Sequence, residues 1–200
     1  VRLFAGYGYD EQLFVSGDWV SIAYRNGVPM GSDLKPKAGH APSFIVWATK
    51  DPDDANLDRI QIIKGWTKDG KIFEHVYDVA WSDDRKPGKD GKVPAVRSTV
   101  DVASASYTND VGAVELKKVW NDPSFDPAQD AFYYVRVLQI PTPRWSTYDA
   151  AKLGVAPPKG VAPTVQERAW TSPIWYSAVA ATAQSPTERP ASTTVASVTP

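Results

Sequence analysis

The fold is decided by the stretch from Phe125 to Trp145, FDPAQDAFYYVRVLQIPTPRW. It opens with an Asp-Pro turn and continues into the densest aromatic and β-branched run of the chain, Phe132–Ile140, whose side chains favour a pleated, half-buried surface. Both alternating sets of side chains are largely apolar, which predicts a central strand that is covered on both sides. We expect the strand to stop at Pro141, because a proline cannot donate a ladder hydrogen bond.

Arg144 and Trp145 follow directly after this proline stop. Loops just beyond strand ends are where binding and catalytic residues concentrate. The simpler interpretation is a core strand with a stop and nothing more. The alternative is that both side chains are presented to a site.

The composition bounds the class of protein. The chain has 200 residues, which is enough for one domain with a substantial core. Its 22 Lys and Arg balance 23 Asp and Glu, and this balance argues against a nucleic-acid-binding surface. A content of 17 prolines favours a loop-rich β protein over a helical bundle. The sequence has no cysteine for a disulfide or a thiolate metal site, and no apolar run long enough to span a bilayer.

Working outward, apolar runs and alternation predict further strands at 1–9, 43–49, 57–66, 71–80, 96–107, 111–120 and 167–177. Asp69-Gly70 supplies the positive φ angles of a hairpin turn. Pro173 interrupts the last strand, which suggests an edge position or a bulge. Residues 81–94 form a long, exposed, charged loop. Short helices are expected at 18–25, stopped in the left-handed conformation by Asn26-Gly27, and at 146–153, ended by Gly154.

Together these elements predict a mainly β fold over residues 1–178. We expect an antiparallel immunoglobulin-like β-sandwich with one or two short helices and long loops. Six tryptophans are expected to supply much of the core: Trp19, Trp47, Trp66, Trp120, Trp170 and Trp175.

Residues 179–200 form a tail rich in Ala, Ser, Thr and Pro, without any aromatic residue. Such a segment cannot bury enough apolar area to offset its ordering entropy alone. It either packs on its own domain or a neighbouring molecule, or adds Thr193–Val198 as a strand to another copy of the chain.

Patterns for catalysis or metal binding are few. The two histidines, His40 and His75, are too few for a site that holds several metal ions, and no nucleophile elbow or phosphate-binding loop is present. Asp51, Asp53 and Asn56 are weak calcium candidates, because Asn56 stands where a calcium loop needs glycine. A solvated turn is the simpler interpretation. We therefore expect no metal site and no cofactor in this chain.

The long charged loop carries Arg85, with Trp81 at its start. By default this is a solvated run of charges. If this loop and the proline stop overhang one site, Arg85 and Arg144 could clamp an anionic group. The indole rings of Trp81 and Trp145 could then line a sugar or aromatic substrate.

Several long runs carry a family resemblance: the quoted stretch, DRIQIIKGW (58–66), YDVAWSDDRKPGKDGKVP (77–94), TVDVASASYTNDVGAVEL (99–116) and QERAWTSPIWY (166–176). In this order they resemble the C-terminal part of an exported bacterial family, domain of unknown function 3604. Members of that family resemble PHP-type (polymerase and histidinol phosphatase) metal-dependent phosphoesterases. The resemblance spans roughly residues 1–176.

The resemblance implies that this chain starts where the catalytic part of its parent protein stops. Divalent metal ions are then expected in that missing catalytic domain, which is also the expected partner. This chain would have no catalytic activity alone. It would buttress the catalytic domain and shape substrate access through the loops at residues 77–94 and 141–146. The implied location is periplasmic or extracellular. The chain has no initiator methionine and no signal peptide, so we expect it to begin after processing or to be a fragment.

Two other functions stay open. One is a structural or adhesive β subunit that assembles with other copies through residues 179–200. The other is a carbohydrate-binding module that uses exposed tryptophans. A sandwich permits either function, because a fold does not imply a function.

Overall fold

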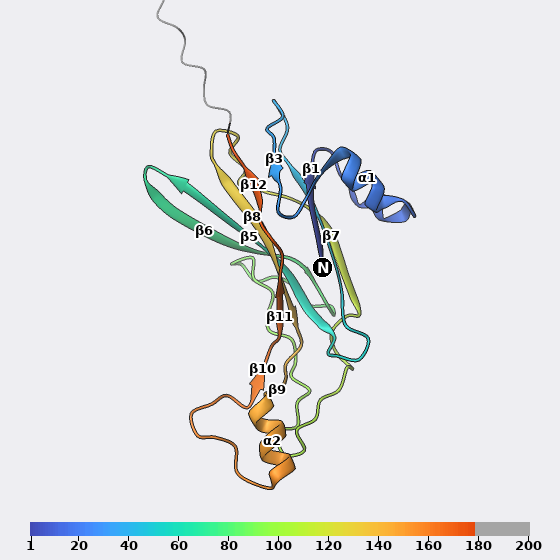
Figure 1. Ribbon diagram of the computed structural model, residues 1–200, viewed down its shortest axis with the longest axis vertical. Helices are drawn as coiled ribbons and strands as arrows, with labels where there is room; N and C mark the ends of the chain where they lie inside the picture. Colours follow the sequence, from blue (N-terminus) through green and yellow to red (C-terminus); the bar gives the residue numbers. More distant parts are fainter. Residues whose placement is uncertain (179–200) are drawn as a thin grey trace, which may run out of the picture.

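The computed structural model describes residues 1–178, which form a mainly β protein with short helices (Figure 1). The helices are η1 (Glu11–Val15, a 3-10 turn), α1 (Trp19–Asn26) and α2 (Trp145–Leu153). No helix in this part of the chain is long and apolar enough to cross a membrane. The predicted tail strand at Thr193–Val198 lies outside the described residues.

Two larger sheets make up the fold. The strands of the first sheet are, in spatial order, β2 (Gly27–Pro29), β1 (Arg2–Gly6), β4 (Ser43–Thr49) and β7 (Glu115–Asn121). The strands of the second are β3 (Asp33–Leu34), β12 (Ile174–Tyr176), β8 (Ala131–Gln139), β5 (Leu57–Lys68) and β6 (Lys71–Trp81), with β11 (Arg168–Trp170) also paired to β8. A small ribbon joins β9 (Thr142–Pro143) to β10 (Thr164–Val165). The pairing is antiparallel except between β12 and β3, which run parallel, so the second sheet is mixed.

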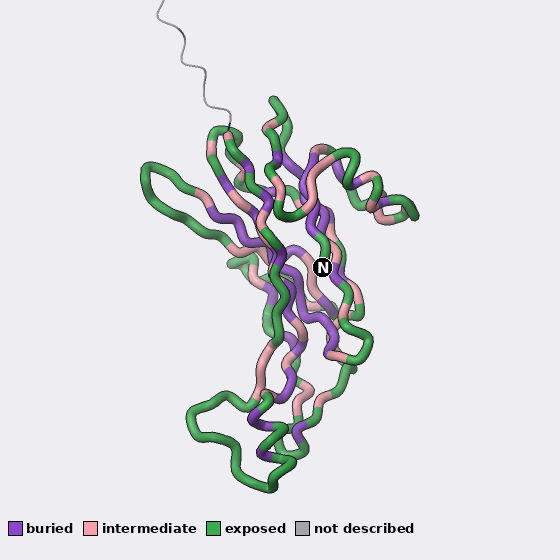
Figure 2. Tube along the Cα trace, viewed as in Figure 1, coloured by how far each residue is buried: buried purple, intermediate pink, exposed green. Residues whose placement is uncertain are grey.

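The predicted central strand is β8, which lies between β5 on one side and β11 and β12 on the other. Its inward side chains are those of the odd-numbered residues Ala131, Tyr133, Val135 and Val137. They join one buried cluster to which both sheets contribute, including Phe44 and Val46 of β4 and Ile60 and Ile62 of β5. In Figure 2 the buried residues lie along the strands in the middle of the molecule.

The expectation that β8 is covered on both sides is wrong for its first half. Phe132, Tyr134 and Arg136 point away from the core and are only half-buried. Trp170 and Trp175 pair with this strand opposite Arg136 and Phe132, so they share the outer face and are 56% and 48% exposed. Strand alternation therefore places both tryptophans outside the core. The prediction that they belong to the core is wrong.

Helix α1 covers the outer face of the first sheet, where Trp19 stacks on Trp47 with ring centroids 4.6 Å apart. The expected left-handed stop at Gly27 is wrong, because its φ is −164°, which is extended backbone. The need for glycine is steric. A Cβ atom on Gly27 would lie 2.2 Å from the carbonyl oxygen of Ala5 on the paired strand β1.

Two local predictions are confirmed. The β5–β6 hairpin turns at Asp69 and Gly70, with φ of 51° and 70°, as a primed turn requires. Helix α2 ends at Gly154, whose φ is 68° and whose amide N–H returns to the last turn of the helix. In both cases the sequence carries the stop signal within the turn itself.

The strand predicted at 96–107 is wrong, because that segment forms a loop with a single bridge from Asp101 to Ser106. The Asp101 carboxylate accepts a hydrogen bond from the Ala103 amide at 2.9 Å, and Ala105 has a φ of 49°. An Asx-type turn of this kind competes with extended structure. The strand predicted at 111–120 is confirmed only from Glu115 onward.

A buried ion pair joins the two sheets. Lys64 of β5 donates from Nζ to Oδ2 of Asp122, just beyond β7, at 2.6 Å, and both side chains are almost fully buried. The Tyr133 hydroxyl donates to the same oxygen at 2.8 Å, and Lys64 also reaches the Ser124 carbonyl oxygen at 2.8 Å. Burial and the Asp122 charge together raise the pKa of Tyr133, so this hydroxyl keeps its proton.

We predict that Lys64→Met lowers the free energy of unfolding by about 3–5 kcal/mol, because it leaves the Asp122 carboxylate buried without its cation. The matched control is Lys118→Met, which removes an exposed ion pair to Glu11 and should cost less than about 1 kcal/mol. Urea unfolding of the three proteins measures the difference. Equal losses for the two variants would contradict the structural role of the buried pair.

Candidate functional site

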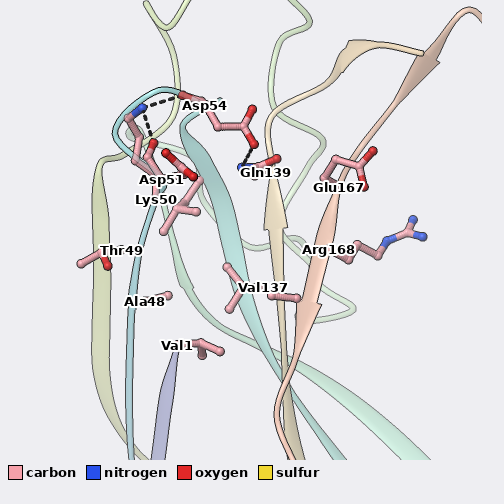
Figure 3. A pocket seen from close by; sticks show the side chains of 12 residues that line it. Val1, Ala48, Thr49, Lys50, Asp51, Asp54, Val137, Gln139, Glu167 and Arg168 are labelled. Carbon is pink, nitrogen blue, oxygen red and sulfur yellow. Dashed lines mark hydrogen bonds between the residues drawn. The ribbon is translucent and has the colours of Figure 1, made fainter. Parts of the chain in front are cut away.

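A groove lies at the end of the molecule where β8 leads into β9. It consists of two adjoining hollows of about 390 and 300 Å³ that share Asp54 and Glu167 as lining residues. We call them the upper and lower hollow of the groove. The upper hollow is drawn in Figure 3, and residues from both larger sheets line it.

The upper hollow is shaped by the turn after β4. Lys50 folds its ammonium group back onto this turn and donates to the carbonyl oxygens of Asp51, Pro52 and Asp54 at 2.9, 3.0 and 2.5 Å. The Asp54 carboxylate accepts a hydrogen bond from Gln139 Nε2 at 3.1 Å across the hollow (Figure 3). Among residues 1–178, Gln139 Oε1 is buried and has no hydrogen-bond partner.

The lower hollow is lined by aromatic rings and charged groups. Tyr107, Trp145 and Tyr148 supply the rings, and Arg144 supplies a cation beside the two shared carboxylates. Burial raises the pKa of Tyr107, and the nearby negative charge of Asp54 raises it further. The Tyr107 hydroxyl therefore remains a proton donor.

Arg144 and Trp145 stand together at the start of α2, which begins at Trp145, one residue before the predicted start at 146. Arg144 is the N-cap residue, and its Nε donates to the Ala162 carbonyl oxygen at 2.9 Å. This bond holds the proline-rich loop that follows α2 against the helix start. Trp145 is 72% exposed, so its ring is free to contact a partner or a ligand.

Arg85 and Trp81 form a separate arrangement at the base of the long charged loop. The Arg85 guanidinium pairs with the Asp58 carboxylate at 2.7 Å and donates to the Asp58 and Pro94 carbonyl oxygens. Trp81 donates from its indole N–H to the Arg85 carbonyl oxygen at 2.7 Å. Neither residue lines the two hollows, so the structure does not bring Arg85 and Arg144 to one hollow of this groove.

The acidic turn has a structural organisation. The Asp51 carboxylate accepts a hydrogen bond from the Asp53 amide at 3.0 Å, and Asn56 turns away to donate to the carbonyl oxygens of Asn109 and Val111. Within residues 1–178, no group of three or more His, Cys, Asp or Glu is placed to hold a metal ion.

Sequence reasoning missed most of the groove. No pattern in the sequence marks Asp54, Glu167, Gln139 or Tyr107 as a site residue. They lie far apart along the chain and meet only because β8 and β11 are paired and the 107–113 loop folds against the turn. The proline stop was the one local signal that pointed here.

The groove combines three carboxylates (Asp51, Asp54 and Glu167), two guanidinium groups (Arg144 and Arg168), the Lys50 ammonium group, the Gln139 amide and three aromatic rings. These groups can orient a polar ligand by directed hydrogen bonds while the rings cover its apolar parts. The described residues of the groove present no nucleophile–base pair that an observed hydrogen bond joins.

A comparison with protein families finds one match. The family model described as "Protein of unknown function (DUF3604)" matches residues 1–178. No curated protein matches the chain, and no solved structure matches it.

We predict that Arg85→Ala lowers the free energy of unfolding by about 2 kcal/mol or more, because it removes the charged partner's bonds to the Asp58 carboxylate and to the Asp58 and Pro94 carbonyl oxygens, although Arg59 still pairs with Asp58. Arg97→Ala is the matched control. Its guanidinium pairs with Asp110 at 3.0 Å on the surface of the same long segment, and its loss should cost less than about 1 kcal/mol. Thermal or urea unfolding compares them. A loss for Arg85→Ala no larger than for Arg97→Ala would restore the solvated-loop interpretation.

Proposed function

Because the chain belongs to the DUF3604 family over residues 1–178, we propose that it is the C-terminal β portion of an exported hydrolase related to the PHP-type phosphoesterases. In this proposal the divalent metal ions belong to an upstream catalytic domain of the same protein. The present chain buttresses that domain and shapes access to its site, and it has no activity alone. The small number of histidines supports the placement of the metal ions in another domain. This chain has two, His40 in a loop and His75 on β6, and a site for several metal ions needs more.

The proposal includes the finer architecture. We propose that the two larger sheets face each other as an immunoglobulin-like β-sandwich, with β3 as a parallel addition. The shared buried cluster supports this arrangement, because β1, β4 and β7 contribute to the same core as β5, β6, β8 and β12. A sandwich of this kind is a rigid support from which loops at one end can be presented.

The observation that carries the docking role is an exposed apolar surface around α2. It projects at one end of the molecule, together with the loop that follows it (Figure 1). We call this surface the α2 lobe; its exposed apolar residues are Trp145, Tyr148, Leu153, Val155 and Val161. Exposed apolar residues gathered in this way mark interaction surfaces. Domain docking removes them from water.

The groove adjoins the α2 lobe, since Trp145 and Tyr148 belong to both. A catalytic domain docked on the lobe would therefore face Arg144 and the two carboxylates. Arg144 is the group best matched to a phosphate or carboxylate, because its planar guanidinium makes paired hydrogen bonds. This is the basis for keeping Arg144 and Trp145 as substrate-proximal residues.

The docking role predicts different effects in the full-length protein and in the isolated chain. Leu153→Ser should lower the melting temperature and increase protease sensitivity of the full-length protein, because Leu153 is 71% exposed in this chain but is expected to be covered by the catalytic domain. It should leave the isolated chain unchanged. Val15→Ser, at a residue that is 82% exposed on η1, is the control. If Leu153→Ser and Val15→Ser change the melting temperature of the full-length protein by the same small amount, the docking role is wrong.

Arg144→Ala is predicted to lower kcat of the full-length protein about 100-fold, the usual cost of losing one well-aimed donor to a developing charge. The assay is turnover on a panel of phosphoesters, read beside melting curves. If Arg144 only holds the loop through Ala162, the melting temperature falls and the rates stay unchanged, which would leave it a scaffold residue.

A further inference from the structure

A second surface of the molecule is unexplained by the proposed docking role. It lies on the outer face of the second sheet. Directly opposite residues on paired strands point to the same face, and the pairs Phe132–Trp175 and Arg136–Trp170 therefore place two tryptophans beside the outward residues of β8. The resulting row of rings, which we call the aromatic track, consists of Trp170, Tyr134, Phe132 and Trp175.

Three rings of the track, those of Tyr134, Phe132 and Trp175, are neighbours, and the Trp175 ring is tilted by 47° to that of Phe132. Phe132 and Tyr134 are nearly parallel, with an interplanar angle of 13° and centroids 6.3 Å apart, and Trp175 is 5.1 Å from Phe132. Phe132 reaches over the neighbouring strand, because a Cβ atom on Gly65 would lie 2.2 Å from its Cζ. Glycine at this place in β5 therefore lets the phenyl ring lie close against the sheet.

A hollow of about 370 Å³ adjoins one end of the track. Phe132, Trp175 and the exposed Ile72 provide its apolar lining, and Thr67, Asp130 and Ser177 provide polar groups at its edge. Asp130 is the only charged residue that lines it, and its carboxylate already accepts a hydrogen bond from the Ala178 amide at 2.7 Å. The hollow is of a size for a small ligand group.

The row of rings includes one charged side chain, Arg136, which lies opposite Trp170 and is half-buried. It donates from Nε to the neutral Gln61 Oε1 at 2.7 Å, and Gln61 donates to the Asp78 carboxylate at 2.7 Å. A charged polymer would meet this single guanidinium in the row and no series of charges. The ligand that fits is neutral, has flat apolar faces and carries hydrogen-bonding groups at its edges.

We propose that the aromatic track binds a neutral polysaccharide. One face of a pyranose ring presents C–H groups, which stack on aromatic rings and leave water, while the hydroxyl groups remain at the edge. The 6.3 Å between the Phe132 and Tyr134 rings is the ordinary spacing of alternate residues on a strand, so an extended chain that runs along β8 meets one ring after another. The hollow beside Trp175 holds a further sugar unit. A protein partner fits less well, because a stable interface needs about 20–30 residues a side and the track is one row of rings.

The test uses the full chain of 200 residues and five polysaccharides. Binding is measured by affinity electrophoresis with laminarin, xylan and galactomannan and by sedimentation with cellulose, with alginate as the anionic comparison. The wild type should bind at least one neutral polysaccharide and not alginate. Trp175→Ala should weaken binding about tenfold or more, and Trp175→Phe should retain most of it because the ring remains.

The matched control is Tyr24→Ala, which removes an exposed ring from α1 and should leave binding unchanged. Melting curves of each variant separate lost binding from lost folding, and Trp170→Ala tests the far end of the track. The proposal is overturned if no neutral polysaccharide is bound, if alginate alone is bound, or if Trp175→Ala and Trp170→Ala both bind as the wild type does. It is also overturned if sedimentation shows self-association that Trp175→Ala abolishes, because the track is then an interface between copies.

Discussion

The fold depends on one buried ion pair between sheets. Lys64 projects from the second sheet into the core, and Asp122 meets it from the end of the first sheet. Burying these charges costs several kcal/mol each unless both are fully bonded. Here the lysine also bonds a carbonyl oxygen, and the carboxylate accepts further bonds from Tyr133 and Ser124. The pair thereby links the two sheets, since a shift of one sheet against the other would leave these charges buried without their partners.

The same principle recurs where the long loop meets the sheet. Arg59 and Arg85 both bond Asp58, and Arg59 also reaches Asp78 and the Val93 carbonyl oxygen. A loop of this length would be costly to order by apolar contact alone, since most of its residues are charged or small. Hydrogen bonds and ion pairs to Arg59, which is buried, and to Arg85, which is partly buried, hold the loop in place of apolar packing. Arg85, which looks like a solvated charge in the sequence, is therefore one of the residues that order the loop.

Local chemistry made part of this structure predictable. The β5–β6 hairpin and the end of α2 each carry their signal in adjacent residues, Asp69-Gly70 and Gly154. The strand β8 was readable from its density of aromatic and β-branched residues. The loop at 96–107 was not, because Asx turns and strands share the same short polar sequences. The groove was not predictable either, since Asp54 and Glu167 meet only through the pairing of distant strands.

Strand β8 also explains why aromatic residues in this protein divide between two tasks. Tyr133 points into the core and bonds Asp122, whereas Phe132 and Tyr134 on either side of it must point outward. The partner strand obeys the same alternation, so Ile174 and Tyr176 are buried and Trp175 is not. The core places no demand on residue 175, and a polar side chain there would leave every buried contact intact. An indole ring at that position, beside a phenyl ring seated on glycine, is therefore better explained by what the outer face binds than by what stabilises the fold.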